Sequence, residues 1–216
     1  MTSVLQSKWY TLAEQPLTFV REQALAACLG HEVSAEQMVT LRDAPRFAPR
    51  MQQRLLEHFQ LRDLTGLPVP DDADLQVLLL DEAQLARLPR LCGAVWHAAT
   101  LSREIRGEVV NQYRQELGAD TLRLALDLRQ LAGAADLLRT PAALIEAIDR
   151  DGAACMGAWL AAQSESLRRW LRLRLDPSIP QHQADPRQAL VVRSVAAALA
   201  QQGAQETTDK GSADHD

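Results

Sequence analysis

Aromatic residues are scarce in this chain: they make up 4% of its 216 residues, whereas hydrophobic residues as a whole make up 47%. The hydrophobic share is carried mainly by Leu and Ala, which lose little side-chain entropy in a helix. The β-branched and aromatic residues that favour strands are few. The composition therefore predicts an all-α, compact multi-helix protein.

The chain also lacks an excess of positive charge. Its formal net charge is −5, and its Arg residues lie among acidic ones. A face that binds nucleic acid, or one that anchors the chain on an anionic membrane, would need a basic surplus. We therefore expect no nucleic-acid partner.

Long apolar runs and a disulfide framework are missing as well. No apolar run approaches the roughly 20 residues of a membrane span, and residues 1–5 lack the basic start and apolar stretch of a secretory signal. The three cysteines, Cys28, Cys92 and Cys155, are an odd number and each stands in an apolar run, which favours buried, reduced thiols. These features predict a cytoplasmic protein without direct membrane insertion.

Catalytic signatures are absent too. The sequence contains no dinucleotide-binding glycine pattern, phosphate-binding loop, nucleophile elbow, or Cys and His pairs at metal-ligand spacing. Asp149-Arg150-Asp151-Gly152 is partly similar to a calcium loop, but its glycine comes too early and Leu160 stands where the bidentate Glu should be. We interpret this segment as a helix start. The sequence thus predicts a non-enzymatic protein with no catalytic, cofactor-binding or metal site.

Proline and glycine divide the chain into lobes. The segment 66–70, Gly-Leu-Pro-Val-Pro, interrupts the helical pattern just before an acidic run. It predicts an N-terminal helical lobe over 1–66 and a main helical lobe over 71–202. After Gln202 the large apolar residues end, and the composition predicts a disordered acidic tail over 203–216.

Local capping signals predict several helix ends. A capping box occupies 34–37, and both Thr140-Pro141 and Asp185-Pro186 place a capping residue before a proline. A helix over 102–117 should end at Gly118, and Asp120 is placed to cap the next one.

The segment 171–175, Leu-Arg-Leu-Arg-Leu, fits two structures. Its strict alternation is typical of a half-buried strand, but the residues before it keep helical spacing. We expect a helix that ends before Pro177, with a short strand as the alternative.

His97 beside Trp96 is the pair most similar to a reactive site. An imidazole against an indole could act as a base or a proton-linked switch. However, the neighbouring residues are Leu, Ala and Val, which favours a packed His with one satisfied nitrogen. Gly93, one turn earlier, is expected to let another backbone approach closely.

The candidate partner-binding residues are an arginine cluster around one tryptophan. Arg and Trp are enriched at the centres of protein interfaces. The alternative is a solvated helix face whose Arg stems lie over apolar surface. The cluster consists of Arg168, Arg169, Trp170, Arg172 and Arg174.

Two segments carry a resemblance to a known family. Residues 91–99, Leu-Cys-Gly-Ala-Val-Trp-His-Ala-Ala, resemble the central helix of the SctK/YscK family, in which a Gly precedes a His by four residues, as Gly93 precedes His97. Trp159-Leu160-Ala161-Ala162, followed by Trp170 and the alternating 171–175, resembles that family's C-terminal pattern. The resemblance covers roughly residues 75–176.

The resemblance implies a role as an adaptor in type III secretion. Members of the family are cytoplasmic components of the sorting platform, where they join the cytoplasmic domain of the SctD-type inner-membrane ring protein to the SctQ-type pod protein. A chain of this kind would lie at the inner membrane through its protein partners. Two alternatives stay open: a helical secretion chaperone, and a helical small-molecule-binding enzyme that uses His97.

Overall fold

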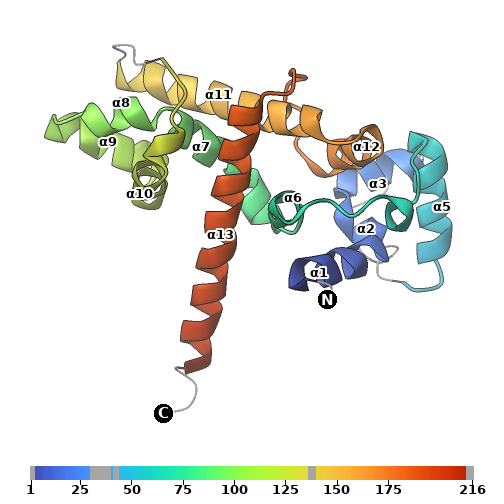
Figure 1. Ribbon diagram of the computed structural model, residues 1–216. Coiled ribbons are helices and arrows are strands. Elements are labelled where there is room, and N and C mark those ends of the chain that lie inside the picture. The colour runs from blue at the N-terminus through green and yellow to red at the C-terminus, as the bar shows by residue number, and fades with distance from the viewer. Residues whose placement is uncertain (1–2, 30–39, 41–43, 136–139, 213–216) are drawn as a thin grey trace. The chain divides into compact units, whose positions relative to one another are not determined.

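The computed structural model describes residues 3–29, 40, 44–135 and 140–212, with side chains as far as Gln202. Within these residues all regular secondary structure is helical, which confirms the predicted all-α class. The chain forms two compact units: residues 1–75 with 163–178, and residues 76–162 with 179–216. Figure 1 shows the helices of both.

Unit 1 is built around buried aromatic rings. Trp9 and Phe19 meet edge to face with centroids 6.2 Å apart, and Phe19 meets Trp170 in the same way at 6.3 Å. Such T-shaped pairs add to the stability gained from area burial. The helices of unit 1 are α1 (Val4–Ala13), α2 (Pro16–Phe19), α3 (Glu22–Leu29), α5 (Ala48–Phe59), η1 (Leu64–Gly66) and α12 (Glu165–Arg174), and α6 (Asp72–Leu78) spans the boundary with unit 2.

Unit 2 has three long helices that pack against one another, α7 (Glu82–Trp96), α11 (Pro141–Ala162) and α13 (Pro186–Ser212). Figure 1 shows the shorter helices at one end of this unit. They are α8 (Ala98–Arg103), α9 (Gly107–Leu117), α10 (Ala119–Asp127) and η2 (Arg129–Leu131). The core of the unit is aliphatic and small, with Leu88, Ala94, Ile148, Ala158 and Val195 among its buried residues.

The crossing of α7 and α11 depends on two glycines. A Cβ on Gly93 would overlap the carbonyl oxygen of Ile148, and one on Gly152 would overlap that of Pro89. The two backbones therefore lie closer than any side chain would allow. This confirms the prediction that Gly93 admits another backbone.

Local capping signals were largely correct. Thr140 Oγ1 accepts a hydrogen bond from the Ala143 N–H at 3.3 Å. Asp185 Oδ1 accepts from the N–H groups of Arg187 at 2.8 Å and Gln188 at 3.2 Å. Gly118 ends α9, as predicted. The predicted capping box over 34–37 lies outside the described residues.

Three helix predictions were wrong. Gly118, at φ 88°, is itself the N-cap of α10, so Asp120 lies in the first turn and not at the cap. The helix predicted over 102–117 is divided, because α8 ends at Arg103 and α9 begins at Gly107. Residues 149–152 lie inside α11 and do not begin a helix.

Most of the alternating segment 171–175 and the first part of the tail 203–216 are helical. Residues 171–174 form the last turn of α12, so the helix prediction is confirmed and the strand alternative is wrong. The helical backbone of α13 continues over 203–212, the first part of the segment predicted to be disordered. Propagation explains this, because extending an existing helix costs little. No helix among the described residues is long and apolar enough to cross a membrane.

Candidate partner-binding surface

The helix α12 carries the predicted arginine cluster. Ser164 begins it by accepting a hydrogen bond from the Leu167 N–H at 3.4 Å. Leu167, Trp170 and Leu171 follow at helical spacing and form its buried face. The opposite side of the helix is left to the charged residues.

Trp170 lies in the core of unit 1 and not on its surface. Its side chain is 0% exposed, and its Nε1–H donates to the Arg62 carbonyl oxygen at 2.8 Å. A buried indole usually requires such an acceptor. Trp170 therefore holds α12 to the segment after α5, and this ring is not available as an anchor for a partner.

Arg169 ties α12 to the end of α5. Gln60, the C-cap of α5, has left-handed backbone angles (φ 51°), and its carbonyl oxygen accepts a hydrogen bond from Arg169 Nη1 at 3.2 Å. Arg169 Nη2 also pairs with Glu165 at 2.8 Å. A guanidinium near the C-terminus of a helix satisfies a carbonyl and complements the helix dipole.

Arg168 and Arg174 are also engaged within unit 1. Arg168 Nη2 donates to the Gln163 carbonyl oxygen at 3.0 Å. The guanidinium of Arg174 lies 4.5 Å from the ring centroid of Phe19, which is a cation–π contact. Both side chains are half-buried.

Arg172 differs from its neighbours. It is exposed and makes no hydrogen bond or ion pair with the described residues. Glu165, Arg169 and Arg172 are spaced by four and three residues on α12, and all are exposed. They form one solvent-facing stripe of α12, which we call the α12 stripe, with one negative charge followed by two positive ones.

The second candidate, His97, lies at the joint between α7 and α8. It is 1% exposed, and its Nε2 lies 2.8 Å from Asp151 Oδ2 on α11. The predicted packed imidazole with a satisfied nitrogen is thus confirmed. A ligand in solution cannot reach this ring unless the α7–α11 packing opens.

The pair is held by a third residue. Arg150 Nε donates to Asp151 Oδ1 at 2.8 Å. Burial alone would raise the pKa of the Asp151 carboxyl, but the hydrogen bonds from Arg150 and His97 outweigh it and lower that pKa from its ordinary value. Asp151 is therefore ionised at neutral pH.

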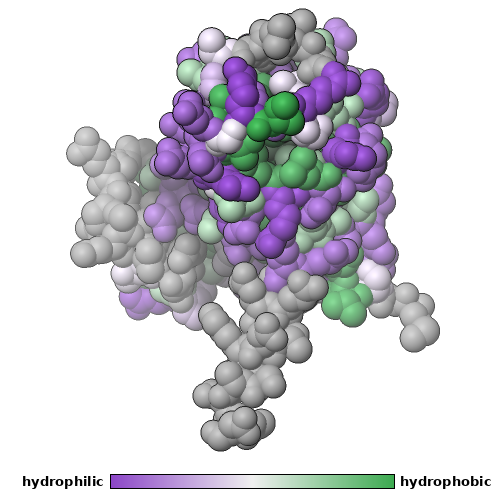
Figure 2. All heavy atoms as spheres, turned by 90° about the vertical axis from the view of Figure 1, so that its left-hand side faces the viewer, coloured by the Kyte–Doolittle hydropathy of each residue, from purple (hydrophilic) through white to green (hydrophobic). Residues whose placement is uncertain are grey.

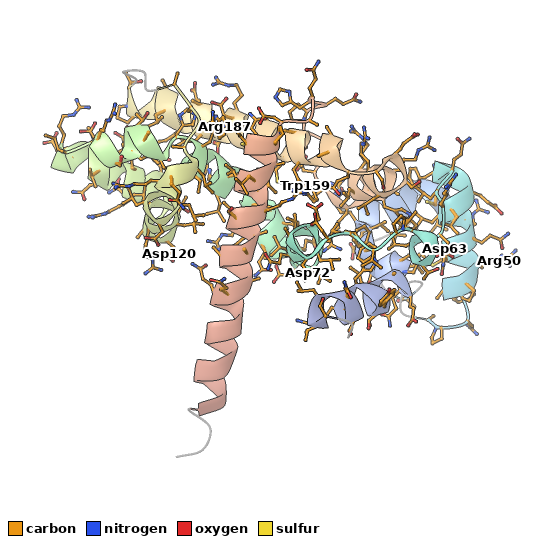
Figure 3. The ribbon with its side chains drawn as sticks, in the orientation of Figure 1. Arg50, Asp63, Asp72, Asp120, Trp159 and Arg187 are labelled. Atoms are coloured by element: carbon orange, nitrogen blue, oxygen red, sulfur yellow. The ribbon has the colours of Figure 1, made fainter. Side chains whose placement is uncertain are left out.

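Trp96 packs as part of the same joint. Its carbonyl oxygen accepts hydrogen bonds from the N–H groups of Gly133 and Ala134, both at 3.1 Å. The ring lies so close to Gly133 that a Cβ there would overlap it. Arg187, at the start of α13 in Figure 3, lies 5.8 Å from the ring centroid. These contacts fasten the segment after η2 to the end of α7.

The cysteines are free and buried, as predicted. Burial raises the pKa of the Cys155 thiol to about 12, with Asp151 and Asp185 adding to the effect. Burial also raises the pKa of Cys92 well above its usual range. Both thiols are thus protonated and unreactive at neutral pH. Among the described residues no group of three or more His, Cys, Asp and Glu side chains could hold a metal ion.

The sequence interpretation missed two residues. Asp151 was assigned to a helix start. In the structure Asp151 precedes Gly152, which packs against Gly93, and this crossing brings the Asp151 carboxylate to His97. Ile105 received no attention, yet it is 91% exposed. Its signal was present, since it is the large apolar residue in the charged run 103–108.

Comparison with known proteins identified relatives of the chain. It is 34% identical over 153 residues to the nodulation protein NolU of Rhizobium fredii, a match that spans 70% of this chain and 68% of that protein. The nodulation protein NolU of Sinorhizobium fredii (strain NBRC 101917 / NGR234) matches to the same extent. No protein-family model and no solved structure matches the chain.

Proposed function

The chain belongs to the family of the nodulation protein NolU, and from this premise we propose that it is a non-enzymatic, cytoplasmic adaptor of a bacterial type III secretion sorting platform. In this role it joins the cytoplasmic domain of an SctD-type ring protein to an SctQ-type pod protein.

The observation that carries the proposal is the place of the SctK/YscK-like residues in the fold. Gly93 and His97, whose spacing resembles that family, both lie at the junction of α7 and α11, one in backbone contact with Ile148 and the other paired with Asp151. A Gly and a His that hold two helices together are expected to recur, at the same spacing, in proteins that have the same helix crossing. The resemblance therefore supports a common architecture and, with it, a common role.

The burial of His97 argues against the alternative in which this residue acts in an enzyme active site, and so favours the non-enzymatic adaptor. The enzyme alternative requires the imidazole to face a ligand, but its Nε2 is committed to Asp151 and its ring is 1% exposed. A general base must come within hydrogen-bond reach of the proton that it takes. The geometry favours a structural role for this residue.

We assign the α12 stripe, on unit 1, as the surface that binds one of the two partners. Arg172 is exposed, and Arg169 keeps about half of its side-chain surface in solvent, at 48% exposure. Exposed guanidinium groups complement an acidic partner, mainly by raising the association rate. The predicted binding role of the cluster thus narrows to these two residues.

Binding of two purified partners tests the proposal. The full chain should bind the cytoplasmic domain of the SctD-type ring protein and the SctQ-type pod protein from its own system, each in a separate titration. All three should co-elute in size-exclusion chromatography. A chain that binds neither folded partner is not this adaptor, and one that instead binds a single export substrate is a chaperone.

A further inference from the structure

The N-terminal part of α5 carries a row of arginines. Arg46, Arg50 and Arg54 are spaced by four residues and all are exposed. The helical hydrogen-bond pattern begins before α5 itself, because the Ala48 N–H donates to the Ala44 carbonyl oxygen. The three side chains therefore lie on one face of the helix, with Cβ atoms about 5 to 6 Å apart from one to the next. We call them the α5 row, and Figure 3 shows Arg50 on the outer side of α5.

No carboxylate neutralises the α5 row. Among the described residues, Arg50 makes no side-chain hydrogen bond or ion pair. The Arg46 guanidinium lies 4.6 Å from the ring centroid of Phe47, a contact that leaves its charge in place. Arg54 donates from Nε and Nη2 to the Cys28 carbonyl oxygen at 3.4 and 3.3 Å. Its partner is therefore a neutral group, and all three positive charges remain uncompensated.

The local charge differs here from that of the whole chain. The helix α5 and the two residues before it contain three arginines but one carboxylate, Glu57, which accepts a hydrogen bond from Gln53. No acidic residue occupies the first turn, where the helix dipole favours one. The net charge of −5 excludes a basic surplus of the whole chain but not this local one. An anionic surface on this face would offset the repulsion among the arginines.

Apolar residues accompany the row but are few. Pro45, Phe47 and Pro49 are exposed and alternate in the sequence with Arg46 and Arg50. Phe47, at 37% exposure, is the one large apolar residue exposed between residues 44 and 63, all of which are described. Protein interfaces usually have an apolar centre rich in aromatic side chains. A single ring beside a row of charges does not provide such a centre.

An anionic bilayer fits this surface better than a folded protein does. Headgroup phosphates accept hydrogen bonds from guanidinium groups without requiring a complementary shape, and each basic residue near such a surface adds to the binding. An aromatic ring beside the charges can lie at the level of the headgroups, as it does in peripheral helices. Attachment of this kind requires no membrane-spanning helix.

We propose that the α5 row and Phe47 bind unit 1 to the surface of a membrane that contains anionic phospholipid. The contact is peripheral: the guanidinium groups bind headgroup phosphates, and the Phe47 ring lies among the headgroups. This inference goes beyond the proposed adaptor function and does not depend on it. For such an adaptor, the bilayer would be the one that anchors its ring protein.

The test uses the full chain and three variants. Arg46→Gln combined with Arg50→Gln removes two charges of the row, and Phe47→Ser removes the ring. Arg87→Gln combined with Arg114→Gln removes two exposed arginines of unit 2 and is the matched control. Figure 2 shows abundant hydrophilic side chains on a face of unit 2, so this control separates the row from exposed charge in general. Circular dichroism and urea unfolding establish that each variant folds as the wild type does.

Vesicle flotation then measures binding to equal parts of phosphatidylglycerol and phosphatidylcholine, and to phosphatidylcholine alone. We expect the wild type to bind the anionic vesicles and not the neutral ones, and added salt to weaken that binding. The double variant of the row should bind the anionic vesicles roughly tenfold more weakly or worse. Phe47→Ser should also bind more weakly but keep the salt dependence. The unit 2 control should stay within about twofold of the wild type, because a contact specific to the row does not involve its charges.

Four results would overturn the inference: a wild type that binds neither kind of vesicle, one that binds both equally, an equal loss in the unit 2 control, and unchanged binding of the row variant or of Phe47→Ser. If the row variant keeps its vesicle binding but loses affinity for the ring or pod protein, the row binds an acidic protein surface instead. Because the vesicles contain no protein, failure of this test leaves the adaptor proposal standing. Loss of the adaptor proposal likewise leaves the vesicle result unaffected.

Discussion

Gly93 and Gly152 face each other across the crossing of α7 and α11. A Cβ built on Gly93 would lie 3.1 Å from the Gly152 nitrogen, and one built on Gly152 would lie 3.0 Å from the Gly93 nitrogen. Each would also overlap a backbone carbonyl of the other helix, which cannot move aside as a flexible side chain could. The crossing therefore has no room for a methyl group on either helix.

Alanine at either glycine should destabilise unit 2. Overpacking of this kind costs about 1 to 3 kcal/mol, and it should outweigh the gain that alanine brings to a helix. Urea unfolding followed by circular dichroism measures the effect for Gly93→Ala and Gly152→Ala. The control is Gly107→Ala, because nothing lies within 4 Å of a Cβ there. Equal stability of Gly93→Ala and Gly107→Ala would show that the helices do not cross as described.

Trp170 should contribute to stability before it contributes to binding. Trp170→Ala removes a buried ring and should cost about 3 to 5 kcal/mol. Trp170→Phe keeps most of the ring but leaves the Arg62 carbonyl without its donor, which should cost about 1 to 3 kcal/mol. Tyr10→Ala, at an exposed aromatic residue of the same unit, should stay near the wild type. A stable Trp170→Ala that no longer binds a partner would place this ring at an interface after all.

The Asp151 carboxyl should make stability depend on pH in acid. Its pKa is lower in the folded chain than the ordinary value of 3.8. Its contribution is therefore fully present above that value and is lost as the pH falls through the folded-state pKa. We expect the wild-type free energy of unfolding to decline below about pH 4, and Asp151→Asn to lack that part of the decline.

Unfolding by urea at pH 6, 5, 4 and 3 provides the measurement. Asp127→Asn is the matched control, since it removes an exposed carboxylate of the same unit, and its curve should run parallel to that of the wild type. Parallel curves for Asp151→Asn and the wild type would contradict the contribution assigned to the His97–Asp151 pair.

These contacts also show which parts of the fold could be predicted from sequence. Thr140 and Asp185 act on N–H groups two or three residues away, so their local signals were sufficient. The helix α12 belongs to unit 1 because Trp170 donates a hydrogen bond to the Arg62 carbonyl oxygen, which is far away in the sequence. No local sequence pattern could predict that contact. For this reason the chain-order boundary near 66–71 assigned α12 to the main lobe, whereas it packs with the first unit.

The candidate site was predictable in part for a similar reason. An aromatic residue among arginines has the same composition whether its ring packs inside the chain or against a partner, so the sequence could not show that Trp170 is buried. It did identify Arg169 and Arg172, which the helical period of α12 places on the solvent side. Ile105 was missed because its exposure results from a clamp between its two neighbours.

Charge reversal at Arg172 should weaken binding to an acidic partner without affecting the fold. Arg172→Glu removes no contact within the described residues but places a negative charge in the last turn of α12, so urea unfolding should show a loss of no more than about 1 kcal/mol. Combined with Arg169→Glu it should lower the affinity for one partner at least tenfold, about 1.4 kcal/mol, and reduce its salt dependence. The double variant should also lose some stability, because Arg169 caps the Gln60 carbonyl. Lys8→Glu, an equal charge change on α1, is the control, and an equal loss there would mean that only net charge matters.

Removal of residues 205–216 should leave the fold nearly unchanged. The buried residues described on α13 end at Leu199, so the truncation spares the packing against α7 and α11. Thermal unfolding of the shortened and full chains should give the same midpoint and the same cooperativity. A broad or lowered transition in the shortened chain would show that this last segment of α13 supports unit 2.

The split composition of unit 1 has a consequence for synthesis. The Trp170 indole and the Arg62 carbonyl that it bonds are 108 positions apart, and the first segment of unit 2, residues 76–162, is encoded between them. A ribosome that adds about 5 to 20 residues per second needs roughly 5 to 20 s to cover that interval. During this time the nascent first unit lacks α12, and apolar surface that Trp170 will later cover faces solvent or a chaperone. The earlier helices of unit 1 can therefore complete their packing only after the ribosome has synthesised α12.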